Sequence, residues 1–204
     1  MTLDRFRLLA DRLLAPFLRG ALVLGLTPDA VSLIAFGFAV AAAGTFYLTG
    51  SGGFPGEFWY LVGALLVFAS GWLDLLDGAL ARELEVDSRA GDLLDHVLDR
   101  YADVVILAGL AAGIGRYALG FAAVTGVLLT SYLGTQIEAI GMDREYGGLL
   151  GRADRLALIG AVAAVAPFAP AVGEITIVGW LLAFLAVVGH ITALQRFFGA
   201  WRAL

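Results

Sequence analysis

Four aspartates near the middle of the chain are spaced as the ligands of a metal ion would be. The segment DLLDGALARELEVDSRAGDLLDHVLD, residues 74–99, lies between two long apolar stretches and carries Asp74, Asp77, Asp95 and Asp99. Residues three or four positions apart share one face of a helix, so each pair can present its carboxylates together. Carboxylate oxygens suit magnesium, manganese or calcium, and magnesium commonly works on phosphorylated substrates. The pattern therefore favours metal-dependent phosphoryl or phosphodiester transfer.

Small residues accompany both aspartate pairs on the predicted helix faces. At 3.6 residues per turn, the face around the first aspartate pair, within residues 74–82, spans an arc of about 140°. The face around the second pair, within residues 91–99, spans about 80°. The eight residues between Arg82 and Gly91 are enough to reverse the chain, so the two faces can converge. The small residues would leave space for a substrate, and Arg82 is suited to hold a phosphate oxygen. The first face holds Asp74, Asp77, Gly78, Ala81 and Arg82, and the second holds Gly91, Asp95 and Asp99.

The rest of the chain is unusually apolar. Of its 204 residues, 60% are hydrophobic and 15% are charged, and the mean hydropathy is +0.88, whereas an average soluble domain has about 25% charged residues. A membrane-spanning helix needs about 20 apolar residues, so this length accommodates about six. The absence of cysteine excludes thiolate metal sites. We therefore expect an all-α integral membrane protein and not a soluble globule.

Apolar runs and turn residues divide the chain into six transmembrane helices preceded by an N-terminal interfacial amphipathic helix. Residues 1–20 show an apolar face and a charged face at helical spacing, as a helix lying in the membrane interface does. The expected spans cover residues 30–48, 58–82, 91–113, 117–140, 153–169 and 175–197. We expect residues 30–198 to form a six-helix bundle and residues 1–204 to form one membrane domain.

The placement of arginine predicts the orientation. Six spans put the N-terminus, the 83–90 loop, the 141–152 loop and the C-terminus on one side, and this side carries most of the 13 basic residues. Arg116 is alone in the opposite loops. Basic loops stay in the cytoplasm, so the aspartates are expected at a cell membrane, at the cytoplasmic ends of the second and third spans.

Aspartates within a membrane also fit a different class of protein, a transporter that conducts protons or cations. Such a protein usually carries polar groups through the depth of the bilayer and often consists of two related halves. The first, fifth and sixth expected spans are nearly free of acidic residues, and the chain has no evident internal repeat. A metal site at one membrane edge is the better interpretation.

The aspartate segment resembles the signature of the CDP-alcohol phosphotransferase family, D-x-x-D-G-x-x-A-R-x8-G-x-x-x-D-x-x-x-D. All eight fixed positions are present, namely Asp74, Asp77, Gly78, Ala81, Arg82, Gly91, Asp95 and Asp99. The resemblance implies six spans, an N-terminal interfacial helix, a cytoplasm-facing site and a homodimer. It also implies a reaction in which a second alcohol attacks a CDP-activated alcohol and CMP leaves.

The resemblance further assigns roles to the residues of the signature. The four aspartates would hold two divalent ions, Mg²⁺ or Mn²⁺, and Asp99 would also be the catalytic base. The CDP-substrate would be bound by Asp74, Gly78, Ala81, Arg82 and Gly91. The partners implied are a CDP-lipid donor, a small alcohol acceptor and membrane lipids, with no nucleic acid.

The donor expected at a membrane edge is CDP-diacylglycerol or its archaeal diether counterpart, since the tails can stay in the bilayer. For the acceptor, Arg144, Arg152 and Arg155 cluster at the start of the fifth expected span. Such a cluster suits a phosphate group, and the segment resembles the arginine-bearing segment of phosphatidylinositol-phosphate synthases. Alternatively, these arginines only anchor the helix at lipid headgroups.

One departure concerns the end of the fourth expected span. Phosphatidylinositol-phosphate synthases carry basic residues there, whereas residues 131–141, SYLGTQIEAIG, contain none. We expect a polyol phosphate as the acceptor, such as inositol phosphate or glycerol phosphate. The alternatives are serine, inositol or a soluble CDP-alcohol within the same chemistry.

Overall fold

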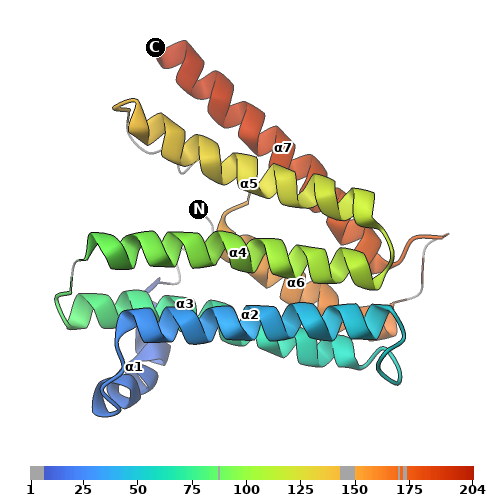
Figure 1. Ribbon diagram of the computed structural model, residues 1–204, viewed down its shortest axis with the longest axis horizontal. Helices are drawn as coiled ribbons and strands as arrows, with labels where there is room; N and C mark the ends of the chain where they lie inside the picture. The colour runs from blue at the N-terminus through green and yellow to red at the C-terminus, as the bar shows by residue number, and fades with distance from the viewer. Residues whose placement is uncertain (1–6, 87, 143–149, 170, 172–173) are drawn as a thin grey trace.

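The protein is a bundle of helices (Figure 1), which confirms the predicted all-α class. The structure, a computed structural model, describes the chain except for residues 1–6, 87, 143–149, 170 and 172–173. The α-helices are α1 (Arg7–Val23), α2 (Pro28–Gly50), α3 (Trp59–Glu83), α4 (Arg89–Gly113), α5 (Tyr117–Ala139), α6 (Arg152–Val165) and α7 (Ile177–Ala203), and a 3₁₀ turn, η2, covers Ala166–Phe168.

Side-chain caps fix where the two helices nearest the aspartates begin. The Thr27 hydroxyl accepts a hydrogen bond from the Ala30 amide at 3.2 Å. The Ser88 hydroxyl likewise accepts from the Gly91 amide at 3.2 Å. Such caps satisfy amides that the first helical turn leaves without an internal partner. They set the start of α2 and of α4.

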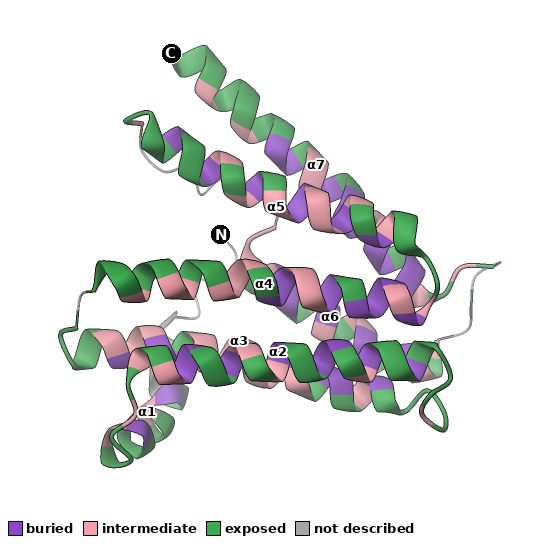
Figure 2. Cartoon of the chain, viewed as in Figure 1, coloured by how far each residue is buried: buried purple, intermediate pink, exposed green. Residues whose placement is uncertain are grey.

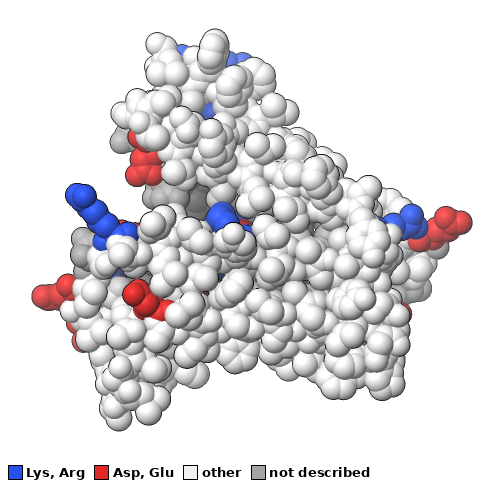
Figure 3. Space-filling model, viewed as in Figure 1, with Lys and Arg blue, Asp and Glu red and all other residues white. Residues whose placement is uncertain are grey.

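In the part of the chain that the structure describes, four helices, α2, α3, α5 and α7, are long and apolar enough to cross a membrane. The predicted third and fifth spans coincide with α4 and α6. The first half of α4 carries several charged residues, and α6 has 14 residues, a length of about 21 Å against a hydrocarbon core of about 30 Å. On the face shown in Figure 3, most of the surface between the charged ends is uncharged.

The helices form two packed groups. Helix α2 packs along both α3 and α4, and α6 packs against α3. Helix α5 packs mainly against α7, and this pair meets the first group chiefly through α4 (Figure 1). Leu14 and Ala21 of α1 pack near Leu76 and Leu80 of α3, so the N-terminal helix lies against the first group.

Burial is uneven along α4. Its buried residues begin at Ala102 and continue to Gly113, whereas the turns before Ala102 are exposed or half-buried (Figure 2). The second half of α4 contributes Ile106 and Leu110 to the main core, beside Phe46 of α2 and Leu182 of α7. Helix α4 is therefore anchored by its second half, and its first half is left to carry polar residues.

Glycines allow close helix contacts in both groups. A Cβ atom added at Gly113 would lie 2.6 Å from the Phe46 carbonyl oxygen, so α4 approaches the backbone of α2 at this end. A Cβ atom added at Gly189 would lie 2.8 Å from the Gly126 carbonyl carbon, which places α7 directly against α5. Small residues commonly allow this kind of backbone approach between membrane helices.

Candidate active site

The two halves of the aspartate segment face each other across the turn between α3 and α4. Carboxylate oxygens of Asp74, Asp95 and Asp99 lie within 4.8 Å of one another. The turn contains Glu85 with a φ of 52°, a left-handed conformation that is uncommon for a residue with a side chain. The predicted convergence of the two helix faces is therefore confirmed for three of the four aspartates.

Asp77 lies apart from this three-carboxylate group. It is on α3, one turn after Asp74, and only 6% of its surface is exposed. The hydroxyl of Ser32 on α2 donates a hydrogen bond to its Oδ2 atom at 2.7 Å. The fourth aspartate is thus held by a helix that lies outside the aspartate segment.

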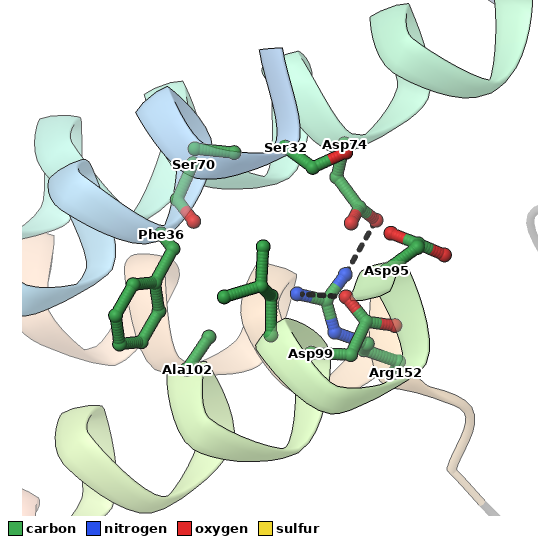
Figure 4. Close-up of a pocket in the computed structure, with 10 residues that line it drawn as sticks. Ser32, Phe36, Ser70, Asp74, Asp95, Asp99, Ala102 and Arg152 are labelled. Atoms are coloured by element: carbon green, nitrogen blue, oxygen red, sulfur yellow. Dashed lines mark hydrogen bonds and ion pairs between the residues drawn. The ribbon is translucent and has the colours of Figure 1, made fainter. Parts of the chain in front are cut away.

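Arg152, at the first position of α6, lies between two of the clustered carboxylates (Figure 4). Its Nη2 atom is 2.8 Å from Asp99 Oδ1, and its Nη1 atom forms an ion pair with Asp74 Oδ2. A cation is favoured here, because closely spaced, half-buried carboxylates repel one another unless a countercharge lies between them. The guanidinium supplies part of that charge, and the oxygen-only donor set fits a hard divalent cation such as Mg²⁺ or Mn²⁺.

Charge pairs continue from this cluster toward the interior. Arg100 lies 3.4 Å from Asp99 and 3.7 Å from Asp103, as expected from one turn of α4. Asp103 in turn accepts a hydrogen bond at 2.6 Å from Arg155 of α6, and this pair is buried, with 3% and 7% of the two side chains exposed. Arg152 and Arg155 therefore have different surroundings although they are one turn apart.

The remaining signature residues lie around the cluster. Arg82 is exposed, and its Nη1 atom would lie 3.5 Å from a Cβ atom added at Gly78. A Cβ atom added at Gly91 would lie 3.2 Å from Asp29 Oδ1, so the first turn of α4 lies against the first turn of α2. Ala81 is half-buried on α3. Arg144, the third arginine of the predicted acceptor cluster, lies outside the described residues.

Two residues that the sequence did not single out belong to these surroundings. Ser32 lines the same small pocket as Asp74, Asp95, Asp99 and Arg152 (Figure 4). Ser131 of α5 accepts a hydrogen bond from Arg100 of α4. Ser32 is one of the few polar residues in an otherwise apolar span, which is the only signal in the sequence that points to it.

An apolar groove between α3 and α6 begins at Asp74. It has a volume of about 810 Å³. Along α3 it extends from Asp74 to Leu61, a distance of about 20 Å at 1.5 Å per residue. Leu65 and Phe68, which line it, are 68% and 64% exposed. The groove joins the carboxylate cluster at one end to a long hydrocarbon surface.

Comparison with known proteins connects this geometry to a family. The model of the CDP-alcohol phosphatidyltransferase family matches residues 25–193. The phosphatidylinositol phosphate synthase of Mycobacterium tuberculosis is 33% identical, and the match covers 93% of this chain and 86% of that protein. The archaetidylinositol phosphate synthase of Methanothermobacter thermautotrophicus is 30% identical, with 99% of this chain and 95% of that protein covered.

Solved structures agree with these sequence matches. The M. tuberculosis phosphatidylinositol phosphate synthase with CDP-DAG bound superposes with a TM-score of 0.77 and 30% identity, over 93% of this chain and 94% of that chain. The same synthase in complex with manganese and citrate gives a TM-score of 0.76 and 29% identity, over 92% and 88% of the two chains. From the aspartate signature, the helical fold and these relatives, it follows that the chain belongs to the CDP-alcohol phosphatidyltransferase family.

Proposed function

We propose that this protein transfers a phosphatidyl or archaetidyl group from a CDP-linked lipid to an inositol phosphate and releases CMP. The observation that carries the proposal is that the apolar groove and the carboxylate cluster meet at Asp74. A lipid donor needs both, because its hydrocarbon tails require an apolar surface and its diphosphate requires the divalent cations that the carboxylates would hold. A water-soluble CDP-alcohol would have no use for the groove.

The donor's CDP group is proposed to lie over the small residues of the signature. Asp74, Gly78, Ala81 and Gly91 would line its site, and none of the three small side chains would obstruct a nucleotide. Arg82, exposed beside Gly78, would bind a phosphate oxygen. This arrangement keeps the nucleotide at the water-exposed end of the bundle and the tails along α3.

Two divalent ions, Mg²⁺ or Mn²⁺, are proposed to bind the four aspartates. Asp74, Asp95 and Asp99 are already close together, and Asp77 is one helical turn from Asp74. When bound, the ions would neutralise the negative charge that develops on the CMP leaving group. The relative solved with manganese and citrate supports this assignment.

The proposed reaction is a displacement at phosphorus. The acceptor hydroxyl oxygen forms a bond to the phosphorus that carries the lipid, the bond from that phosphorus to the bridging diphosphate oxygen breaks, and the electron pair leaves with CMP. The hydroxyl proton passes to a carboxylate oxygen of Asp99, which acts as the base. Asp99 is half-buried at the pocket wall, within reach of the other clustered carboxylates.

The acceptor's phosphate is proposed to bind the arginines at the start of α6. Arg152 lines the pocket beside the aspartates and is therefore better placed than Arg155, the other described arginine of the set. Arg155 would support this site from its buried pair with Asp103, and Arg144 completes the proposed set. Relatives that are phosphatidylinositol or archaetidylinositol phosphate synthases support inositol phosphate as the acceptor. Because Gly134, Thr135 and Gln136 lie in a segment without the basic residues of such synthases, glycerol phosphate is the second choice.

The proposed setting is the cell membrane, with six spans, an interfacial N-terminal helix and the active site facing the cytoplasm. Helices α4 and α6 would be the third and fifth spans, shielded in part by the four more apolar helices. The concentration of arginine on one side supports the orientation. A homodimer is also proposed, as the family resemblance implies.

The purified protein should be incubated with CDP-diacylglycerol or its diether analogue, Mg²⁺ and one acceptor at a time. We expect CMP release and a phosphate-bearing lipid with inositol phosphate, identified by mass. A serine lipid alone, or reaction only with a soluble CDP-alcohol, would reject the proposal.

The acceptor arginine has its own test. Arg152→Ala should raise the KM of the acceptor more than that of the CDP-lipid, because a charge-assisted hydrogen bond worth about 1.5–3 kcal/mol is lost. Arg202→Ala, an exposed arginine at the end of α7, is the matched control and should change neither KM. Equal effects of Arg152→Ala on both substrates would count against the acceptor role.

A further inference from the structure

Ser32 makes a hydrogen bond that joins two helices at the active site. Its hydroxyl on α2 donates to Asp77 Oδ2 on α3 at 2.7 Å, and 7% of Ser32 and 6% of Asp77 are exposed. The Pro28 carbonyl oxygen lies 3.1 Å from the same hydroxyl. A serine hydroxyl has one proton to donate, and the ionised carboxylate is both the nearer and the stronger acceptor.

Other hydroxyls in α2 show that this contact is not a general property of the helix. Thr45 donates to the Ala41 carbonyl at 2.8 Å, and Thr49 donates to the Thr45 carbonyl at 2.7 Å. Both bonds stay within the helix, which is the usual way for such residues to satisfy their hydroxyls there. Among these three hydroxyls, Ser32 is the one directed at a carboxylate on a neighbouring helix.

We propose that Ser32 is a positioning residue for divalent metal binding. It ties one oxygen of Asp77 to α2 and leaves the other oxygen for the ion. The inference rests on the proposed function, because it takes Asp77 to be a metal ligand. Carboxylate ligands are commonly oriented by hydrogen bonds from outside the ligand set, and loss of such a partner lowers metal affinity about 10–100-fold.

The placement of Ser32 explains why a helix outside the aspartate segment takes part. Ser32 also lines the pocket that contains Asp74, Asp95 and Asp99. Asp77 lies outside that group, and on α3 itself the Gly78 backbone forms a hydrogen bond with its carboxylate, which leaves the side chain some freedom to rotate away from the ion. The hydrogen bond from α2 removes that freedom before the ion arrives, and this pre-orientation is what raises the affinity.

Mn²⁺ titration of the purified protein without substrate tests the proposal, with free Mn²⁺ measured by electron paramagnetic resonance. Ser32→Ala is expected to weaken Mn²⁺ binding about 10–100-fold, whereas Ser32→Thr, which keeps the hydroxyl, is expected to bind as the parent does. Thr49→Val is the matched control on α2 and should leave the affinity unchanged. Size-exclusion chromatography in detergent checks that each variant is folded.

A second pair of variants keeps the test decisive if Ser32→Ala does not fold. Ser32→Thr and Ser32→Val have nearly the same shape and differ in the hydroxyl, so a positioning role requires tighter Mn²⁺ binding by the threonine variant. A purely structural role would lower stability in Ser32→Val and leave its Mn²⁺ affinity equal to that of Ser32→Thr. That result would overturn the inference.

Asp77→Asn separates failure of this inference from failure of the proposed function. If Asp77→Asn binds Mn²⁺ as tightly as the parent, the metal-ligand role of Asp77 is wrong. If Asp77→Asn weakens binding and Ser32→Ala does not, only the positioning role is wrong. If Asp77→Asn and Ser32→Ala each weaken Mn²⁺ binding, the double variant should bind no more weakly than Asp77→Asn alone, because Ser32 acts through Asp77.

Discussion

The group formed by α2, α3 and α4 and the pair formed by α5 and α7 contribute differently to the site. The first group supplies every clustered carboxylate together with Ser32. The pair contributes a hydrogen bond at the edge of these surroundings, in which Ser131 accepts from Arg100. Helix α6 belongs with the first group by packing, since it lies against α3, and it adds Arg152.

The residues proposed to carry out the reaction therefore lie in the first group, apart from the α5–α7 pair. Metal and donor binding depend on side chains whose relative positions are fixed within three tightly packed helices. The α5–α7 pair packs on itself through Gly126 and Gly189 and meets the first group over a smaller surface. Changes in the pair should therefore affect stability before they affect metal binding.

The largest effect is expected from the clustered carboxylates. Asp95→Asn and Asp99→Asn each remove an anionic oxygen from the proposed metal site, which should cost several kcal/mol of transition-state stabilisation, about a thousandfold in CMP release. Asp92→Asn, an exposed aspartate on the same helix, is the matched control. Near-normal turnover in both Asp95→Asn and Asp99→Asn would show that the active site does not lie at the carboxylate cluster of the first group.

The buried pair of Asp103 and Arg155 should matter for stability. Arg155→Met leaves the Asp103 carboxylate buried without its closest partner, and breaking a buried pair in this way costs about 3 kcal/mol or more. The double variant Asp103→Leu/Arg155→Met should recover part of this loss. Chemical unfolding in detergent measures both, and a double variant less stable than Arg155→Met would contradict this account.

The contact between α5 and α7 should have an intermediate effect. Gly189→Ala places a methyl group 2.8 Å from the Gly126 carbonyl carbon, and overpacking of this kind costs about 2 kcal/mol. Gly199→Ala on the same helix has no atom within 4 Å of the new methyl group, so it should be neutral or slightly stabilising. Mn²⁺ affinity should stay unchanged in both, and a decrease in Gly189→Ala would show that the two groups are coupled.

The smallest effect is expected from the hydrogen bond between the groups. Ser131→Ala should reduce stability by about 1 kcal/mol and CMP release by no more than about fivefold. Ser131→Thr keeps the hydroxyl and should restore both. A loss as large as that of Asp99→Asn would place α5 in the reaction centre, and the separation of roles would be wrong.

Helical spacing predicted one part of the site well, namely the convergence of Asp74, Asp95 and Asp99. Spacing states which face of a helix a residue occupies, and the short turn after Arg82 keeps the start of α4 near the end of α3. It could not reveal Ser32, because a single serine in an apolar run forms no pattern. It also could not place Asp77, whose partner lies 45 positions earlier in the chain.

Arg152 and Arg155 show a second limit of the sequence. They are one turn apart and look equivalent in the amino-acid sequence, yet one reaches Asp74 and Asp99 and the other reaches Asp103. Which carboxylate each arginine meets depends on the depth at which α6 lies against α3. The six predicted spans coincide approximately with α2 to α7, although α7 continues to Ala203 and α4 and α6 are less apolar or shorter than the other four.

The contact between Gly113 and the backbone of α2 influences where the other end of α4 lies. Gly113 is about 27 Å from Asp95 along α4, and a hydrogen-bonded helix is stiff over that length. The position of Asp95 relative to α2 therefore depends in part on this distant contact, where a methyl group on Gly113 would meet Phe46. A displacement of 1 Å at reacting groups can cost about a hundredfold in rate, so a residue that touches no substrate can still govern turnover.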